Sequence, residues 1–210
     1  EANVAFSTVE KDSKWEIRSY QNSVSQLNKA LNQIKSEGYM PVGLSLVNNR
    51  MEVFVINSQP FICTNWTLKE YKNTNELSAG ISKMIESGYL PTGMTLVENS
   101  FNVIFAKTKY TGHGWQIVES DLDHQDVAND IQPHLENGYI PVGISVFAGY
   151  YYTLLIQPDD FPVNNYSIRG YDESQSAHLK NGINMEISNG MIPQGYFKQE
   201  GIINILYLKY

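Results

Sequence analysis

The sequence predicts an α+β fold built from four tandem β-α-β-β repeats. A Gly-aromatic-x-Pro-x-Gly pattern occurs three times, and a degenerate fourth copy follows at the same interval. An aromatic residue opens each repeat, and in every repeat the hydrophobic period changes from that of a helix to that of a strand. The four patterns start every 50 to 52 residues, at Gly38, Gly88, Gly138 and Gly190.

Each repeat is expected to open with a strand. In the first repeat, the segment from Trp15 to Tyr20 alternates apolar and polar residues, which is typical of a strand with one buried face. The opening aromatic residues are Trp15, Trp66, Trp115 and Tyr166.

A helix follows the strand in each repeat. Apolar residues stand eleven, seven, and three or four positions before each pattern glycine, so they form one stripe on a helix. The eleven- and seven-position residues are Leu27, Leu31, Leu77, Ile81, Val127, Ile131, Leu179 and Ile183. Asn22, Asn73 and Asp123 stand where an N-cap is expected.

The hexapeptide is predicted to end the helix and begin a hairpin. Its first glycine suits the left-handed conformation that commonly follows a helix, and its proline prevents the helix from resuming. The residues after the proline alternate in period two, reach a short turn and return as a second strand. The structural prolines are Pro41, Pro91, Pro141 and Pro193.

These signals divide the chain into an N-terminal tail, 1–14, and four repeats. The repeats span 15–57, 66–107, 115–157 and 166–210. One helix over three short strands does not bury both faces alone, so the repeats are expected to share a core. We expect a pseudo-symmetric assembly with curved, shared antiparallel sheets and helices on the outer face. A ring, an open array and two lobes of two repeats remain alternatives, and the atypical fourth repeat is interpreted as a possible cap.

Composition and charge narrow the expected partners. The chain has 210 residues, a net charge of −7 and only 15 Lys and Arg residues, without a basic cluster. Such a surface repels phosphate backbones, so nucleic acid is not an expected partner. No run of eighteen apolar residues occurs, so no membrane insertion is expected.

The sequence offers no recognised catalytic, metal or cofactor motif. His113, His124, His134 and His178 lack metal-ligand spacing, and Cys63 has no basic neighbour that would activate its thiol. The acidic residues between Glu119 and Asp130 lack the turn glycine of a calcium loop and are better explained as a helix start. We therefore expect no cofactor and no metal, and we lean against an enzyme.

The repeat resembles two groups of domains. One is a set of small bacterial domains with a Gly-aromatic-x-Pro-x-Gly signature after a helix. The other comprises the tandem repeats that precede the serine-hydrolase domain of fungal polyglycine hydrolases and related secreted bacterial proteins. The resemblance spans most of residues 15–210 and implies an accessory or binding role, since no Ser-x-x-Lys nucleophile motif is present. It also implies an exported bacterial protein, with a cytoplasmic location as the alternative.

Aromatic residues supply the remaining functional signal. Tyr150, Tyr151 and Tyr152 are consecutive and follow Phe147 across a tight turn. Because neighbours on a strand point to opposite faces, at least one ring is expected outside the core. We predict that these four residues bind a protein or glycan partner. The alternatives are a small-molecule or nucleotide pocket between repeats near the Pro-x-Gly segments, and an accessory module of a secreted hydrolase system.

Overall fold

The computed structural model describes residues 15–57, 64–159 and 165–209, in which strand, helix, strand and strand follow one another four times. The N-terminal tail predicted for 1–14 lies outside the described residues. The elements are β1 (Trp15–Gln21), α1 (Val24–Ser36), β2 (Met40–Val47), β3 (Arg50–Ile56), β4 (Asn65–Tyr71), α2 (Thr74–Glu86), β5 (Leu90–Val97), β6 (Ser100–Lys107), β7 (Gly112–Asp121), α3 (His124–Glu136), β8 (Ile140–Phe147), β9 (Tyr150–Pro158), β10 (Asn165–Asp172), α4 (Ser176–Ser188), β11 (Met191–Gln199) and β12 (Ile202–Lys209).

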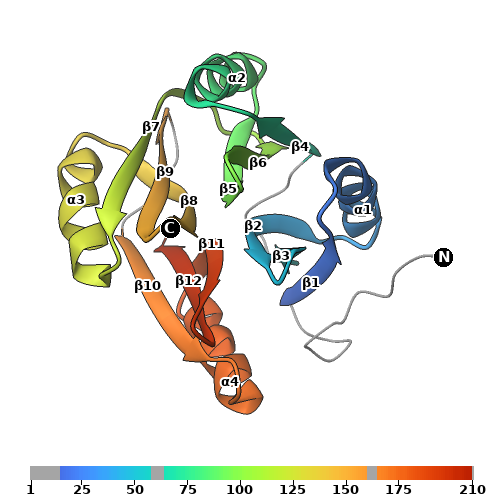
Figure 1. Ribbon diagram of the computed structural model, residues 1–210, viewed down its shortest axis with the longest axis vertical. Helices are drawn as coiled ribbons and strands as arrows, with labels where there is room; N and C mark the ends of the chain where they lie inside the picture. The colour runs from blue at the N-terminus through green and yellow to red at the C-terminus, as the bar shows by residue number, and fades with distance from the viewer. Residues whose placement is uncertain (1–14, 58–63, 160–164, 210) are drawn as a thin grey trace.

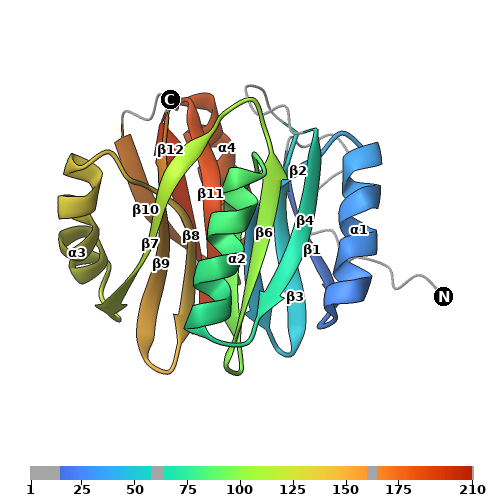
Figure 2. The same ribbon diagram turned by 90° about the horizontal axis from the view of Figure 1, so that it is seen from above.

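The strands form four separate three-stranded antiparallel sheets. In each unit the third strand lies in the middle, as in the order β1-β3-β2. Figure 1 shows the sheets around a common centre, with β2, β5, β8 and β11 innermost and the helices at the periphery. In Figure 2 the β2–β3, β5–β6 and β8–β9 hairpin turns point to the same end of the molecule. Hydrogen-bonded ladders therefore stay within a unit, and the sheet shared between units that the sequence suggested is not present among the described strands.

Glycines allow the innermost strands of neighbouring units to approach closely, because they have no Cβ atom. A Cβ atom at Gly93 would lie 3.1 Å from the Cα of Gly43, and one at Gly143 would lie 2.9 Å from the backbone nitrogen of Met94. A Cβ at Gly43 would lie 2.8 Å from the Cβ of Tyr196, which belongs to the fourth unit. The first and fourth units thus contact each other as neighbours do elsewhere, and the arrangement closes into a ring. The interpretation of the fourth unit as a cap is wrong, because a closed ring has no end to cover.

The helices bury the stripe predicted from the sequence. Leu27, Leu31 and Ile34 of α1 are all at most 1% exposed. In the other helices the counterparts of Leu27 and Leu31 are also buried, whereas those of Ile34 are half-buried. The N-caps at Asn73 and Asp123 are confirmed, because each side chain accepts a hydrogen bond from a backbone N–H of the first turn. In α1 the cap is Ser23, one residue after the predicted Asn22.

The helix ends have the predicted left-handed glycines. Gly38, Gly88, Gly138 and Gly190 have φ angles between 78° and 81°. Within four residues of each glycine the chain has entered the inner strand. In this strand the register of the hydrogen-bonded ladder shifts between the proline and the second glycine of the pattern. The shift is a β-bulge, which kinks the inner strand where it meets its neighbours.

The opening aromatic residues join one unit to the next. Each of the three Trp side chains donates its indole N–H to the helix of the adjacent unit, and Trp15 does so across the ring closure. The bonds are Trp66 Nε1 to Leu31 O at 2.7 Å, Trp115 Nε1 to Ser82 Oγ at 3.2 Å, and Trp15 Nε1 to Asn184 Oδ1 at 2.9 Å. The aromatic marker seen in the sequence is therefore a contact between units.

Candidate functional site

The fourfold recurrence supplies an internal comparison for finding a site. Positions that serve only packing are expected to hold similar residues in every unit, whereas a departure from the pattern needs another reason. The fourth unit departs most, and a cavity lies on each side of it. We name these cavities the seam pocket, between the fourth and first units, and the Tyr166 pocket, between the third and fourth.

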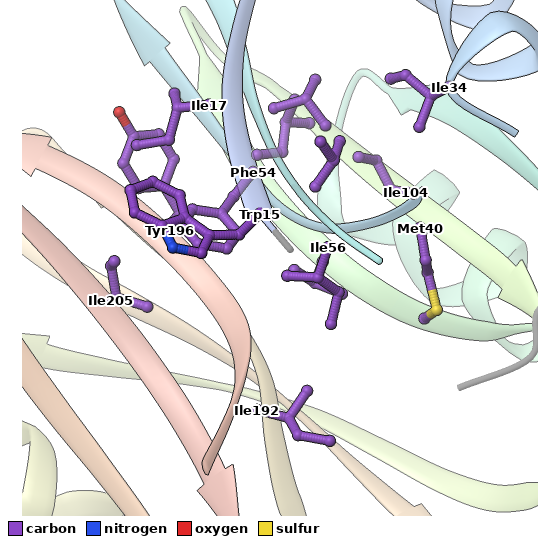
Figure 3. Close-up of a cluster of buried hydrophobic side chains, with 14 of the residues drawn as sticks. Trp15, Ile17, Ile34, Met40, Phe54, Ile56, Ile104, Ile192, Tyr196 and Ile205 are labelled. Carbon is purple, nitrogen blue, oxygen red and sulfur yellow. The ribbon is translucent and has the colours of Figure 1, made fainter. Parts of the chain in front are cut away.

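The seam pocket has a volume of about 380 Å³ and an apolar floor. Trp15 and Ile17 contribute from β1, while Leu179 comes from α4 and Ile203 from β12. Behind this floor Trp15 stacks on Phe54 with ring centroids 5.5 Å apart, and Tyr196 lies 6.2 Å from Phe54 (Figure 3). The aromatic stack belongs to the core that fills the ring closure, so the floor is rigidly supported.

A polar network forms part of the wall of the seam pocket. Lys198 Nζ lies 3.2 Å from Glu52 Oε2 and 2.6 Å from Glu173 Oε1. The Tyr196 hydroxyl donates to the same Glu52 oxygen at 2.6 Å. Burial, together with the Glu52 carboxylate, raises the pKa of Tyr196 well above its usual value, so this hydroxyl stays a donor.

Among the described residues, this network exists at one of the four junctions only. The other units place Leu44, Met94 and Ile144 where the fourth has Tyr196, and Leu46, Leu96 and Val146 where it has Lys198. Glu52 has Asn102, Tyr152 and Asn204 as its counterparts. Packing therefore does not require a carboxylate and an ammonium at these places, and a charged pair this poorly exposed is costly without compensation.

Two more cations stand at the mouth of the seam pocket. Arg50 donates from Nε to Ser19 Oγ at 2.7 Å and from Nη2 to the Ser19 carbonyl at 3.1 Å, which fixes the guanidinium beside β1. Lys180 is in α4 at the position that Asn28 has in α1. The Asn28 side chain donates to the carbonyl oxygen of Leu68 in β4 and accepts from the Leu68 N–H. A lysine ammonium only donates hydrogen bonds, so Lys180 does not make the same pair of bonds.

The Tyr166 pocket has a volume of about 420 Å³ and lies beside α3. Tyr139 and Tyr166 line it together with Leu135, and Gln132 and Glu136 contribute polar groups from the helix. The side chain of Gln132 donates to Glu136 Oε1 at 3.1 Å. Burial raises the pKa of Tyr166 above its usual value.

The predicted aromatic surface is smaller in the structure than the sequence suggested. Tyr150 is 41% exposed, whereas Tyr152 and Phe147 are half-buried. Tyr151 is buried in the core, and its hydroxyl donates to Gln199 Oε1 at 3.1 Å. The expectation that Tyr151 contacts a partner is therefore wrong, since strand alternation turns its ring inward.

Two arginines outside the cavities are paired with carboxylates. Arg18 bonds Glu16 at 2.8 Å and Glu37 at 2.6 Å, and Arg169 bonds Glu186 at 3.1 Å. No three His, Cys, Asp or Glu side chains gather as a metal site in the part of the chain that the structure describes. Cys63 and the side chain of His124 lie outside that part.

His113 and His134 both lie near the surface or the core edge. His113 Nδ1 is 2.6 Å from Asp159 Oδ1, and the hydrogen bonds from Thr111 and His113 hold the pKa of Asp159 below its usual value. His134 packs edge-on against Tyr139, with ring centroids 6.0 Å apart. Both histidines therefore have a partner within the third unit, Asp159 for His113 and Tyr139 for His134.

Comparison with known proteins does not assign the chain to a family. No protein-family model matches the chain, and no curated protein is significantly similar to it. Within the described residues, no helix is both long and apolar enough to cross a membrane. The resemblance to the bacterial domains and to the polyglycine hydrolase repeats stays a prediction.

Proposed function

We propose that this protein binds a small organic anion in the seam pocket, and that its units are four copies of one β-α-β-β repeat with pseudo-fourfold symmetry and helices on the outer face. One observation carries the binding proposal. Arg50, Lys180 and Lys198 surround a largely apolar cavity, although the chain has only 15 Lys and Arg residues and a net charge of −7. A local excess of cations over Glu52 and Glu173 in an acidic protein favours a ligand of the opposite charge.

The shape of the pocket fits a compact ligand with an apolar body. Its volume lies in the range of small-molecule sites, and the floor of Trp15, Leu179 and Ile203 suits a ring or a branched chain. The anionic group would lie near Lys180 and Lys198. Glu173 has a side chain that is 49% exposed, so its bond to Lys198 is open to exchange with an incoming carboxylate.

This proposal is the small-molecule alternative of the sequence analysis, at a different place. The sequence suggested ligands beside the Pro-x-Gly segments, where a glycine admits close approach. At the second glycine of the pattern that space is taken by the neighbouring inner strand, as at Gly93 beside Gly43, whereas Gly138 to Pro141 of the third unit line the Tyr166 pocket. The seam pocket lies further out, between a sheet and the preceding helix.

Titration calorimetry with phenylacetate tests the proposal. We expect a dissociation constant below about 1 mM, equivalent to about −4.1 kcal/mol. Lys180→Met should weaken binding, and Glu173→Gln should strengthen it because Lys198 loses a competing carboxylate. Phenethylamine, which has the same ring and the opposite charge, and Lys29→Met on the exposed face of α1 serve as controls. Equal affinity for the acid and the amine, or an unchanged affinity in both pocket variants, would overturn the proposal.

A second candidate function is the protein or glycan partner predicted from the aromatic run. Tyr150 and Leu122 are each 41% exposed and Ile202 is 38% exposed, so each offers apolar surface to a partner. All three adjoin hairpin turns or strand ends, where binding residues commonly collect. A pull-down from native extract, together with a glycan array, compares wild type with Tyr150→Ala. A partner that the variant retains equally well removes this surface from consideration. Bacterial origin, export and a role beside a hydrolase stay predictions.

A further inference from the structure

Three of the four junctions between units are filled by an indole. Trp66, Trp115 and Trp15 each reach the helix of the adjacent unit and donate the indole N–H to an acceptor there. At the remaining junction, between α3 and β10, the corresponding residue is Tyr166. The position that three units fill with a fused bicyclic ring therefore holds a smaller, single ring.

The contacts between helices and strands also differ among the junctions. α1 packs against β4 and α2 packs against β7, so these junctions are closed. Among the described residues, neither α3 against β10 nor α4 against β1 packs comparably, and a cavity opens at each of these junctions: the Tyr166 pocket of about 420 Å³ at the first and the seam pocket at the second. The two rings that line the Tyr166 pocket, Tyr139 and Tyr166, present apolar faces to whatever enters.

An acceptor for a ring N–H is also present. Ser82 and Asn184 accept the indole N–H of Trp115 and Trp15, and Gln132 is the residue at the corresponding position of α3. The Gln132 side chain uses its amide nitrogen to bond Glu136, so its carbonyl oxygen is its acceptor group. Gln132 lines the cavity together with the two tyrosines.

We propose that the Tyr166 pocket binds a planar heteroaromatic molecule that carries a ring N–H, in the manner of an indole. The ligand ring lies in the cavity beside Tyr166, between the tyrosines and α3, where the larger ring of a tryptophan at this position would reach. Its N–H donates to the Gln132 carbonyl oxygen. The cavity has room for a substituent besides the ring, and this site is independent of the anion proposed for the seam pocket.

Calorimetry or NMR titration of the intact protein with indole tests this site. We expect one indole per chain, and about fivefold weaker binding of 1-methylindole, since one neutral hydrogen bond is lost. Gln132→Leu should remove the preference for indole over its methylated form. Lys29→Met, on the exposed face of α1, should leave indole binding unchanged.

Tyr166→Trp is the decisive variant, because it restores the residue found at the other three junctions. We expect it to fold, to melt at a higher temperature than wild type and to lose indole binding by at least tenfold. Conversely, Trp115→Tyr should add a second indole site. Undiminished indole binding by Tyr166→Trp, a Tyr166→Trp chain that does not fold, or equal binding of indole and 1-methylindole by wild type would each contradict the proposal.

Discussion

The two glycines of each Gly-aromatic-x-Pro-x-Gly pattern serve different purposes. The first, such as Gly88 with φ of 78°, ends a helix in the left-handed region. The second, such as Gly143, has no side chain because the backbone of the neighbouring inner strand occupies that space. The sequence predicted the first purpose from the helix stripe and the proline. It did not reveal the second, because the atoms that crowd Gly143 belong to another unit.

Substitution of the first glycine should cost conformational energy. Gly88→Ala is expected to destabilise the protein by about 1–2 kcal/mol, the cost of an alanine in the left-handed region. Gly88→Asn should cost less, because asparagine tolerates this conformation. Urea denaturation measures both, and equal stability of wild type and Gly88→Ala would contradict the assignment.

Substitution of the second glycine should separate the inner strands. An alanine Cβ at Gly143 would lie 2.9 Å from the Met94 nitrogen, and a backbone atom of a neighbouring unit has little freedom to move. We expect Gly143→Ala to cost about 1–3 kcal/mol, as overpacking does elsewhere. A thermal melt checks the loss, and a melting temperature at or above that of wild type would mean that the ring centre adapts.

At the scale of elements, helices and strands were predictable because each period is local. The change from a stripe of four-residue spacing to alternation marks every helix end, and the start of α1 was missed by only one residue, Ser23 for Asn22. The pairing of the strands was not predictable. The sequence of a three-stranded unit does not show whether its edge strand pairs with the edge strand of a neighbouring unit. Here the neighbouring units meet through close contacts at glycines instead of a shared ladder of hydrogen bonds.

The buried stripe of α1 gives a test of its packing. Leu31 is 1% exposed and lies in a core that includes Trp66 of the next unit. Leu31→Ala is therefore expected to lose about 2–5 kcal/mol of unfolding free energy. Lys29→Ala, on the exposed side of the same helix, is the matched control and should change stability by less than about 0.5 kcal/mol. Similar losses in the two variants would refute the orientation of the helix.

At the scale of the whole molecule, the ring closure depends on residues far apart in the chain. Glu52 meets Tyr196 across a separation of 144 residues. The sequence marked the fourth unit as atypical, but spacing alone did not show that its polar departures face the first unit. The sequence also did not show which of the three consecutive tyrosines faces the core. Tyr151 is the buried one, because burial depends on how its strand is placed in the assembled molecule.

Buried tyrosines make the folded ring sensitive to alkali. Burial raises the pKa of Tyr196 and Tyr207, with Glu52 adding to the effect at Tyr196 and the Tyr171 hydroxyl at Tyr207. A raised pKa in the folded state means that the stabilising contribution is complete below the unfolded value of about 10 and is lost as pH rises beyond it. We expect the melting temperature to fall above about pH 10. Tyrosinate absorbance should rise in step with the loss of helical circular dichroism, and ionisation of all tyrosines in a still-folded protein would contradict this.

We have proposed that the departures of the fourth unit make a binding site on each of its two sides. The most direct measurement is a crystal soak with a set of small fragments that includes aromatic acids and N–H heterocycles. We expect the acids to bind in the seam pocket, beside Lys180 and Lys198, and the N–H heterocycles to bind beside Tyr166 and Gln132. Fragments that gather instead at the junctions closed by Trp66 and Trp115, or that leave both pockets empty, would contradict it.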